Sequence, residues 1–270
     1  MRKKGYRLVF LGLVIGLGLL LAIEYKELVY TRLYPVFRSL EGYRLNHLPT
    51  YQIQEYNGFR IQHVEEDQEY MADLEKAITA YSSSVFDFFD YQPKRTIKMI
   101  VYKDRESLNE ALRLEDQNTM GAFYGDTLNL LSPNAWTSPG RSHIAMLDNV
   151  FVHELTHLVV DDIARGNFPL WFTEGSALYL EYRLLGYEWG KELASMDYFS
   201  MEDLEKRFQS LDDDLAYRQS FVLVKAIVEQ YGREKYLELL NELGRGVPFY
   251  DALEKILGIK SHNVEKLLVP

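Results

Sequence analysis

Hydrophobic and polar residues alternate near position 60, and this alternation begins a series of predicted strands and helices. Residues 59–63 place apolar and polar side chains in turn, the pattern of a half-buried strand. From 66 to 89 apolar residues recur every three or four positions, the spacing of an amphipathic helix. The apolar segment 95–102 predicts a second strand, and 104–114 predicts a helix with Asp104 as its N-cap.

The pattern changes near residue 140. Before it, 120–133 predicts two short strands around the turn Tyr124-Gly125-Asp126-Thr127. After it only helical spacing appears, at about 141–164, 169–186, 200–210, 215–231, 233–243, 247–257 and 261–268. Strands therefore come first and helices second, which predicts an α+β fold with a small N-terminal sheet lobe and a helical C-terminal lobe. The cleft between two such lobes is a natural substrate site.

A basic tip and an uncharged apolar run open the chain. Four basic side chains within residues 1–7 precede the run Leu8 to Ile23. A basic flank before an apolar run is typical of an export signal whose basic end stays in the cytoplasm. The run is shorter than the roughly 20 residues of a usual span, but Tyr6 and Tyr25 flank it and suit the two membrane interfaces. No clear small-x-small cleavage site follows, so an uncleaved signal anchor is favoured over a cleaved signal peptide.

These features predict three parts. Residues 1–25 are a cytoplasmic tip and signal anchor, and 26–55 are a juxtamembrane stalk with room for a short helix from Glu24 to Leu40. Residues 56–270 are the folded domain. The predicted location is the cell membrane, with a single pass and the folded domain outside the cytoplasm; cleavage of the signal would instead release a secreted protein.

Charge and cysteine usage narrow the function. The formal net charge is −10, and because the N-terminal tip is basic, the folded domain is more acidic than the whole chain. An acidic body argues against nucleic acid, and against an anionic membrane surface, as the main partner. The chain has no cysteine, which excludes disulfides, thiolate metal ligands and a cysteine nucleophile.

The segment VFVHELTHLVVDD, Val150 to Asp162, carries the candidate chemistry. His153 and His157 are four residues apart, so on a helix they share one face and can reach the same ion. Neutral imidazole suits zinc. Glu154 stays on the same side of the helix, where a general base for a zinc-activated water belongs. The alternative is a buried core helix with two incidental histidines.

The next predicted helix, LWFTEGSALYLEY, offers a third ligand. Glu174 lies on it, and two histidines with one glutamate are a standard catalytic zinc set. Glu181 lies two turns later on nearly the same face, where it either holds an imidazole N–H or is an ordinary solvated glutamate. Asp161, just after the HExxH segment, either serves a similar purpose or is simply a charge near a helix end.

The two segments together resemble the gluzincin metallopeptidases, the zincin group in which a downstream glutamate joins HExxH. Trp171-Phe172-Thr173-Glu174-Gly175 is similar to the Trp-Leu-x-Glu-Gly run of its aminopeptidase branch. Roughly residues 56–235 also resemble the peptidase-MA-like domains of bacterial exported proteins. The resemblance implies a zincin-like two-lobe domain and Zn²⁺ as cofactor. It also implies His153, His157 and Glu174 as zinc ligands, with Glu154 as general base and later proton donor.

Two further positions follow from the same resemblance. Tyr217 matches the tyrosine that donates a hydrogen bond to the tetrahedral oxyanion in relatives; a packing role is the alternative. The segment 121–125 matches the edge strand beside the substrate. In aminopeptidases that strand carries a glutamate that binds the free amine, whereas here Phe123 and Tyr124 occur and no acid precedes Asp126. This departure favours cleavage within a chain.

The predicted protein is a membrane-anchored, extracytoplasmic zinc metallopeptidase, an endopeptidase acting on peptides or proteins, and not a nucleic-acid binder. One alternative is a catalytically silent zinc-binding scaffold protein on a gluzincin-like fold. Another, which the residues do not exclude, is a zinc hydrolase of non-peptide amides.

Overall fold

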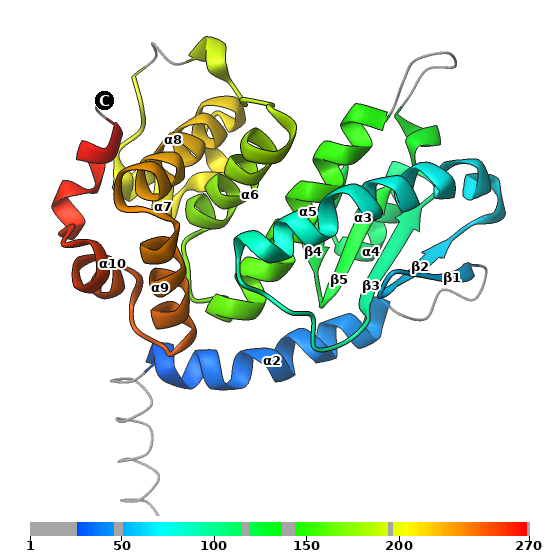
Figure 1. Cartoon of the computed structure of the whole chain (residues 1–270), viewed down its shortest axis with the longest axis horizontal. Helices are drawn as coiled ribbons and strands as arrows, with labels where there is room; N and C mark the ends of the chain where they lie inside the picture. Colours follow the sequence, from blue (N-terminus) through cyan, green and yellow to red (C-terminus); the bar gives the residue numbers. More distant parts are fainter. Residues whose placement is uncertain (1–25, 46–50, 115–118, 137–143, 194–196, 269–270) are drawn as a thin grey trace, which may run out of the picture.

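The computed structural model describes residues 26–45, 51–114, 119–136, 144–193 and 197–268 (Figure 1). The predicted anchor, Leu8 to Ile23, lies outside these residues. Within the described part, no helix combines the length and the apolar character that a membrane crossing requires.

Most of the predicted stalk is one long helix that belongs to the fold. Helix α2 (Lys26–Leu45) runs along both the sheet and the helical part. The boundary predicted between residues 55 and 56 is wrong, because strand β1 (Gln52–Tyr56) pairs antiparallel with β2 (Phe59–His63). The two strands are joined by Asn57 and Gly58, whose φ angles are 45° and 83°. Asn-Gly with two positive φ angles is a favoured two-residue hairpin turn. The alternation of residues 59–63 predicts only the second strand of this hairpin.

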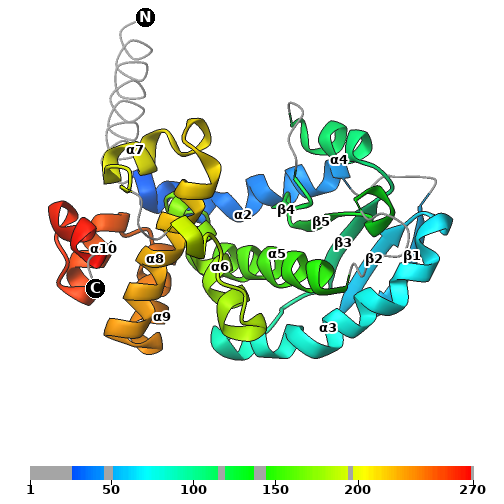
Figure 2. The same cartoon turned by 90° about the horizontal axis from the view of Figure 1, so that it is seen from above.

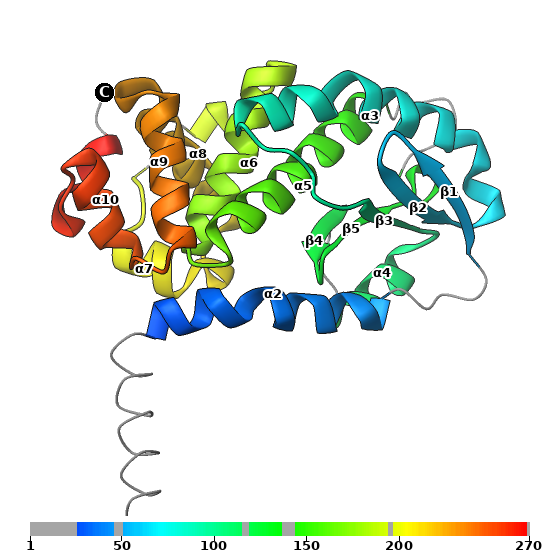
Figure 3. The ribbon, with the colours of Figure 1, turned by 60° about the horizontal axis from the view of Figure 1, so that its bottom comes forward.

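The sheet has five strands in the order β1-β2-β3-β5-β4. Strand β3 (Ile97–Tyr102) runs parallel to β2 and β5 (Thr127–Leu131), and β4 (Gly121–Tyr124) pairs antiparallel with β5. Parallel neighbours require crossover connections, which α3 (Gln68–Phe88) and α4 (Arg105–Leu112) provide. The two helices lie on opposite faces of the sheet (Figure 3). Strand β4 is left as an edge strand, the position that matters for the site.

The rest of the fold is helical, in agreement with the predicted α+β order of strands before helices. Helix α5 reaches from the sheet to the helical part (Figure 2). The predicted helix at 200–210 is a short α-helix followed by a 3₁₀ turn, and the last predicted helix is 3₁₀. The α-helices are α5 (Ile144–Ala164), α6 (Leu170–Leu185), α7 (Met201–Lys206), α8 (Asp213–Tyr231), α9 (Arg233–Gly244) and α10 (Phe249–Leu257). The 3₁₀ helices are Glu65–Asp67, Pro133–Ala135, Lys191–Leu193, Phe208–Ser210 and Ser261–Leu268.

Helix α5 is the centre of the core. Its Phe151 ring lies 5.9 Å from the ring of Phe59 on β2, while its other side packs along α6. Phe151, Leu155 and Val159 are fully buried, and each such side chain stabilises the fold by about 1.5–3 kcal/mol relative to exposure. Because α5 and α6 are packed on most sides, the polar groups that they carry are held in place by a rigid core.

Candidate metal centre and active site

Helices α5 and α6 bring the three predicted ligands together. The rings of His153 and His157 lie on one face of α5 with centroids 4.7 Å apart. Glu174 faces them from α6, with its Oε2 3.3 Å from His153 Nε2 and 3.4 Å from His157 Nε2. All three potential ligand atoms lie within 4.8 Å of one another.

The donor set fits a zinc ion. In a tetrahedral site with bonds of about 2.0–2.1 Å, neighbouring ligand atoms lie about 3.3–3.4 Å apart. The two distances from Glu174 to the imidazoles match this edge length. Glu174 Oε2 is also buried and accepts no hydrogen bond from the described residues, which is costly for a carboxylate oxygen unless a cation is near. The cluster is therefore a candidate zinc site of the two-histidine, one-glutamate kind.

Each imidazole ring makes a hydrogen bond through Nδ1, the nitrogen that faces away from the metal site. His153 Nδ1 donates to Glu181 Oε1 at 2.6 Å, and His157 Nδ1 lies 2.7 Å from Thr173 Oγ1. A carboxylate only accepts, so Glu181 places the proton on Nδ1 of His153 and leaves the Nε2 lone pair for a metal. Glu181 is buried, so the solvated alternative for this residue is wrong. No sequence pattern marks Thr173, which looks like any threonine inside a buried helix.

The charges in this cluster compensate one another. Burial lowers the pKa of His153, but the neighbouring carboxylates of Glu174 and Glu181 outweigh burial and hold that pKa well above its usual value. Burial raises the pKa of Glu174, and the two histidines outweigh this to bring it well below the usual range. In the absence of a metal ion, the side chains of this cluster therefore favour a positive charge at the point where the three ligand atoms meet.

Glu154 lies beside the cluster without belonging to it. It is buried, its Oε2 has no hydrogen-bond partner among the described residues, and burial raises its pKa. A carboxylate with a raised pKa binds a proton more readily, as a general base requires. Gly121 on β4 makes room for this side chain. A Cβ at position 121 would lie 3.0 Å from Glu154 Cγ and 2.8 Å from Val150 Cγ1.

Strand β4 lies at one edge of the described sheet, next to Glu154. Leu131 N donates to Met120 O at 2.8 Å, so the hydrogen-bonded pairs with β5 start at Met120 and alternate along the strand. Gly121 and Phe123 consequently direct their backbone groups away from β5. The Phe123 backbone donates to Glu154, an interaction that lowers the carboxyl pKa but does not cancel the effect of burial.

Tyr217 reaches the same region from α8. Its ring packs against Trp189 and Phe208, with centroids 6.1 Å and 5.5 Å away. Burial and the nearby charges of Glu174 and Glu154 raise its pKa, so the hydroxyl stays protonated at neutral pH. The side chain therefore packs and also keeps a proton to donate.

Sequence comparison agrees with this geometry. The family model described as the peptidase MA superfamily matches residues 85–268, more than half of the chain. The chain belongs to the peptidase MA superfamily. The match begins in the last turn of α3 and leaves out α2, β1 and β2. A comparison with curated proteins gives no match.

Several solved structures are similar to this peptidase MA member at low identity. One is an M1 zinc metallopeptidase from Deinococcus radiodurans, with a TM-score of 0.41 and 14% identity. The alignment covers 80% of this chain and 49% of the metallopeptidase chain. A mutant of an M1 zinc metallopeptidase from Deinococcus radiodurans, bound to a Tyr-Ser-Ala substrate, gives a TM-score of 0.44 with 14% identity and the same coverage. A two-domain M1 zinc metallopeptidase mutant bound to L-arginine gives 0.43 with 13% identity, covering 81% and 50%. The chain spans about half the length of these proteins, and similarity this low does not assign an activity or a substrate.

Asp161 follows neither alternative that the sequence left open. It is buried, and its carboxylate accepts from the Tyr34 hydroxyl at 2.5 Å and from Arg38. Both partners come from α2, so Asp161 neither holds an imidazole nor stands as a solvated charge near a helix end. It attaches α2 to α5.

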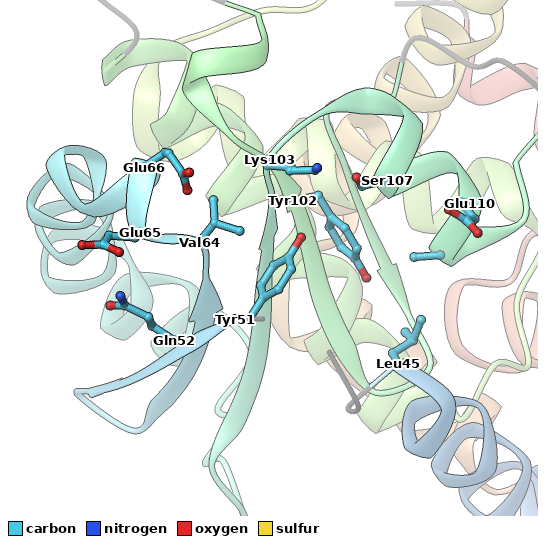
Figure 4. A pocket seen from close by; sticks show the side chains of 11 residues that line it. Leu45, Tyr51, Gln52, Val64, Glu65, Glu66, Tyr102, Lys103, Ser107 and Glu110 are labelled. Atoms are coloured by element: carbon cyan, nitrogen blue, oxygen red, sulfur yellow. The ribbon is translucent and has the colours of Figure 1, made fainter. Parts of the chain in front are cut away.

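A separate cavity of about 810 Å³ lies on the α4 side of the sheet (Figure 4). Tyr51 and Tyr102 form part of its lining with Lys103, Glu65 and Glu66. None of the predicted site residues lines this cavity, so the peptidase MA chemistry is not located there.

Proposed function

We propose that this chain is a membrane-anchored zinc endopeptidase whose catalytic domain lies outside the cytoplasm. The observation that carries the proposal is the convergence of His153 Nε2, His157 Nε2 and Glu174 Oε2, with the buried carboxylate of Glu154 beside them. His153, His157 and Glu174 would hold a zinc ion, and Glu154 would serve as the base for a water molecule activated there.

The protein residues divide the catalytic work. Zinc, when bound to the three ligands, supplies Lewis-acid chemistry that lowers the pKa of water toward ~7 and polarises a carbonyl. Glu154 takes the proton from the attacking water and passes it to the leaving amine nitrogen. The Tyr217 hydroxyl donates to the oxygen that becomes negative as the carbonyl is attacked. Glu181 keeps the ring of His153 in the orientation that binding requires.

Strand β4 supports cleavage within a chain. An extended peptide can add to the outer edge of this strand through main-chain hydrogen bonds, which do not depend on a terminal amine. No acidic side chain occurs in β4 to bind such an amine. The charged group near Phe123 is a cation and not an acid, because the Arg38 guanidinium lies 5.6 Å from the centroid of the Phe123 ring. Tyr124 donates to Glu41 Oε2 at 3.0 Å.

Acetylated peptides test this preference. Matched quenched-fluorescence peptides with free and acetylated N-termini are expected to be cleaved at similar rates. A strict need for the free amine would contradict endopeptidase action while leaving the zinc site intact.

The Glu154→Gln variant of the full chain tests catalysis itself. The amide keeps the shape of the side chain but does not accept a proton from water, so proteolysis of a peptide library is expected only with the wild type. Metal content should be equal in both proteins. Zinc in both proteins with no turnover in either would favour the scaffold alternative.

Membrane anchoring rests on the basic tip and the run Leu8 to Ile23. A reporter fused after Pro270 is expected to be active outside the cytoplasm. A reporter that is active only in the cytoplasm would contradict the topology.

A further inference from the structure

Helix α2 turns its polar side toward the protein and its apolar side outward. Thr31, Tyr34 and Arg38 face the fold, and Thr31 is fully buried. Six large apolar or aromatic side chains share the opposite face and are called here the outer stripe. They are Val29 (38% exposed), Leu33 (47%), Val36 (57%), Phe37 (54%), Leu40 (65%) and Tyr43 (70%). A helix on a water-facing surface has the reverse arrangement, and contiguous apolar exposure marks an interaction surface.

Charged contacts fix the rotation of α2 about its own axis. The side chain of Arg38 is 9% exposed and forms ion pairs with Asp126, Asp161 and Asp162. Tyr34 donates to the same Asp161. Turning the outer stripe inward would break all of these bonds and leave the buried carboxylate of Asp161 without either of its partners from α2, which is strongly unfavourable.

Backbone contacts hold α2 at both ends. Gly125, in the turn between β4 and β5, lies so close that an added Cβ would be 2.9 Å from Gly42 N. Gly246, between α9 and α10, lies so close that an added Cβ would be 2.5 Å from Leu28 Cα. The helix therefore rests on the sheet and on the helical part at once, as Figures 1 and 3 show. Whatever binds the outer stripe orients the whole domain.

The surroundings of the outer stripe favour a lipid bilayer as its partner. Lys26 and Arg32 are exposed on α2, in a chain whose net charge is −10. Basic side chains beside an apolar helical face are typical of helices that lie in the membrane interface. The predicted anchor ends at Ile23 and α2 begins at Lys26, so the intervening chain spans at most about 10 Å.

Resting on the proposed membrane anchoring, we propose that α2 lies in the interface of the same membrane, with its outer stripe among headgroups and upper acyl chains. The catalytic domain is thereby held against the bilayer in one orientation. This role is additional to anchoring and to proteolysis, and it does not require the metal site to be active. It also agrees with the acidic body, because only the α2 face meets the lipid.

The absence of native cysteine makes a direct test practicable. Full-length single-cysteine variants Leu33→Cys and Leu40→Cys carry a spin label in the outer stripe. Ile53→Cys is the matched control, since Ile53 is 54% exposed and lies on β1, at the sheet edge opposite β4. Each protein is reconstituted into vesicles of phosphatidylcholine and phosphatidylglycerol. We then measure how accessible each label is to oxygen, which concentrates in lipid, and to a nickel chelate, which stays in water.

Labels at positions 33 and 40 are expected to be relaxed more by oxygen than by nickel, and the label at 53 more by nickel. Equal nickel accessibility at all three positions would overturn the proposal. Shielding of positions 33 and 40 from both reagents would also overturn it, and dipolar broadening would then identify a second copy as the occupant. Neither readout depends on zinc or turnover, so a failure here is distinct from a failure of the proposed peptidase activity.

Discussion

The hydrogen bond between Glu181 and His153 determines how firmly the site holds its metal. Glu181→Gln keeps the size of the side chain and an acceptor oxygen but removes the negative charge. The bond is 2.6 Å long and Glu181 is 4% exposed, so water has little access to replace the lost interaction. Removing such a partner typically weakens metal binding about 10–100-fold, or about 1.4–2.7 kcal/mol.

The second imidazole provides the matched control. His157 Nδ1 lies 2.7 Å from the neutral hydroxyl of Thr173, and Thr173→Ser keeps that hydroxyl. Zinc affinity is expected to change by less than about threefold in this variant, because the hydrogen bond survives.

Competition with a fluorescent zinc chelator at neutral pH measures both dissociation constants, and circular dichroism checks that the variants are folded. An unchanged dissociation constant for Glu181→Gln would refute the reasoning. An equal loss in both variants would also refute it, since the charge of Glu181 would then not be the cause.

Three further variants and one control variant test other parts of the structure. Tyr217→Phe should lower kcat about 100–1,000-fold with little change in KM or zinc content, because one donor to the oxyanion is lost; unchanged kinetics would leave Tyr217 a packing residue. Gly121→Ala should lower kcat about 10–100-fold at full zinc occupancy, because the added Cβ displaces Glu154. Full activity in that variant would contradict the close packing of β4 on α5. Arg38→Met should lower the free energy of unfolding by about 3–5 kcal/mol in urea denaturation, while exposed Arg32→Met should change it by less than about 0.5 kcal/mol. Similar losses in both would argue that α2 is not held through Arg38.

The chemistry of the site was predictable because it is encoded locally. The spacing of His153 and His157 places both rings on one face of any helix, whatever the fold around it. Glu174 follows in a segment whose apolar spacing also predicts a helix, and the family resemblance identifies it as the third ligand. The strands and helices between residues 59 and 268 are marked by the same kind of short-range periodicity.

The contacts of α2 were not predictable in this way. Arg38 and Asp161 are 123 residues apart, and nothing in either local pattern connects them. The apolar residues of α2 have helical spacing but face outward, so a pattern-based prediction assigns them to no particular partner. The β1 hairpin is a different case, because Asn57-Gly58 is a local turn signal in the sequence that predicts this hairpin without any long-range information.

Zinc stoichiometry and coordination test the central claim most directly. The full chain, purified in detergent and examined by elemental analysis and zinc-edge X-ray absorption, should contain one zinc per chain bound by two imidazole nitrogens and a carboxylate oxygen at about 2.0–2.1 Å. His157→Ala should lose most of that zinc. A wild-type protein without zinc, or zinc retained in full by His157→Ala, would contradict the account.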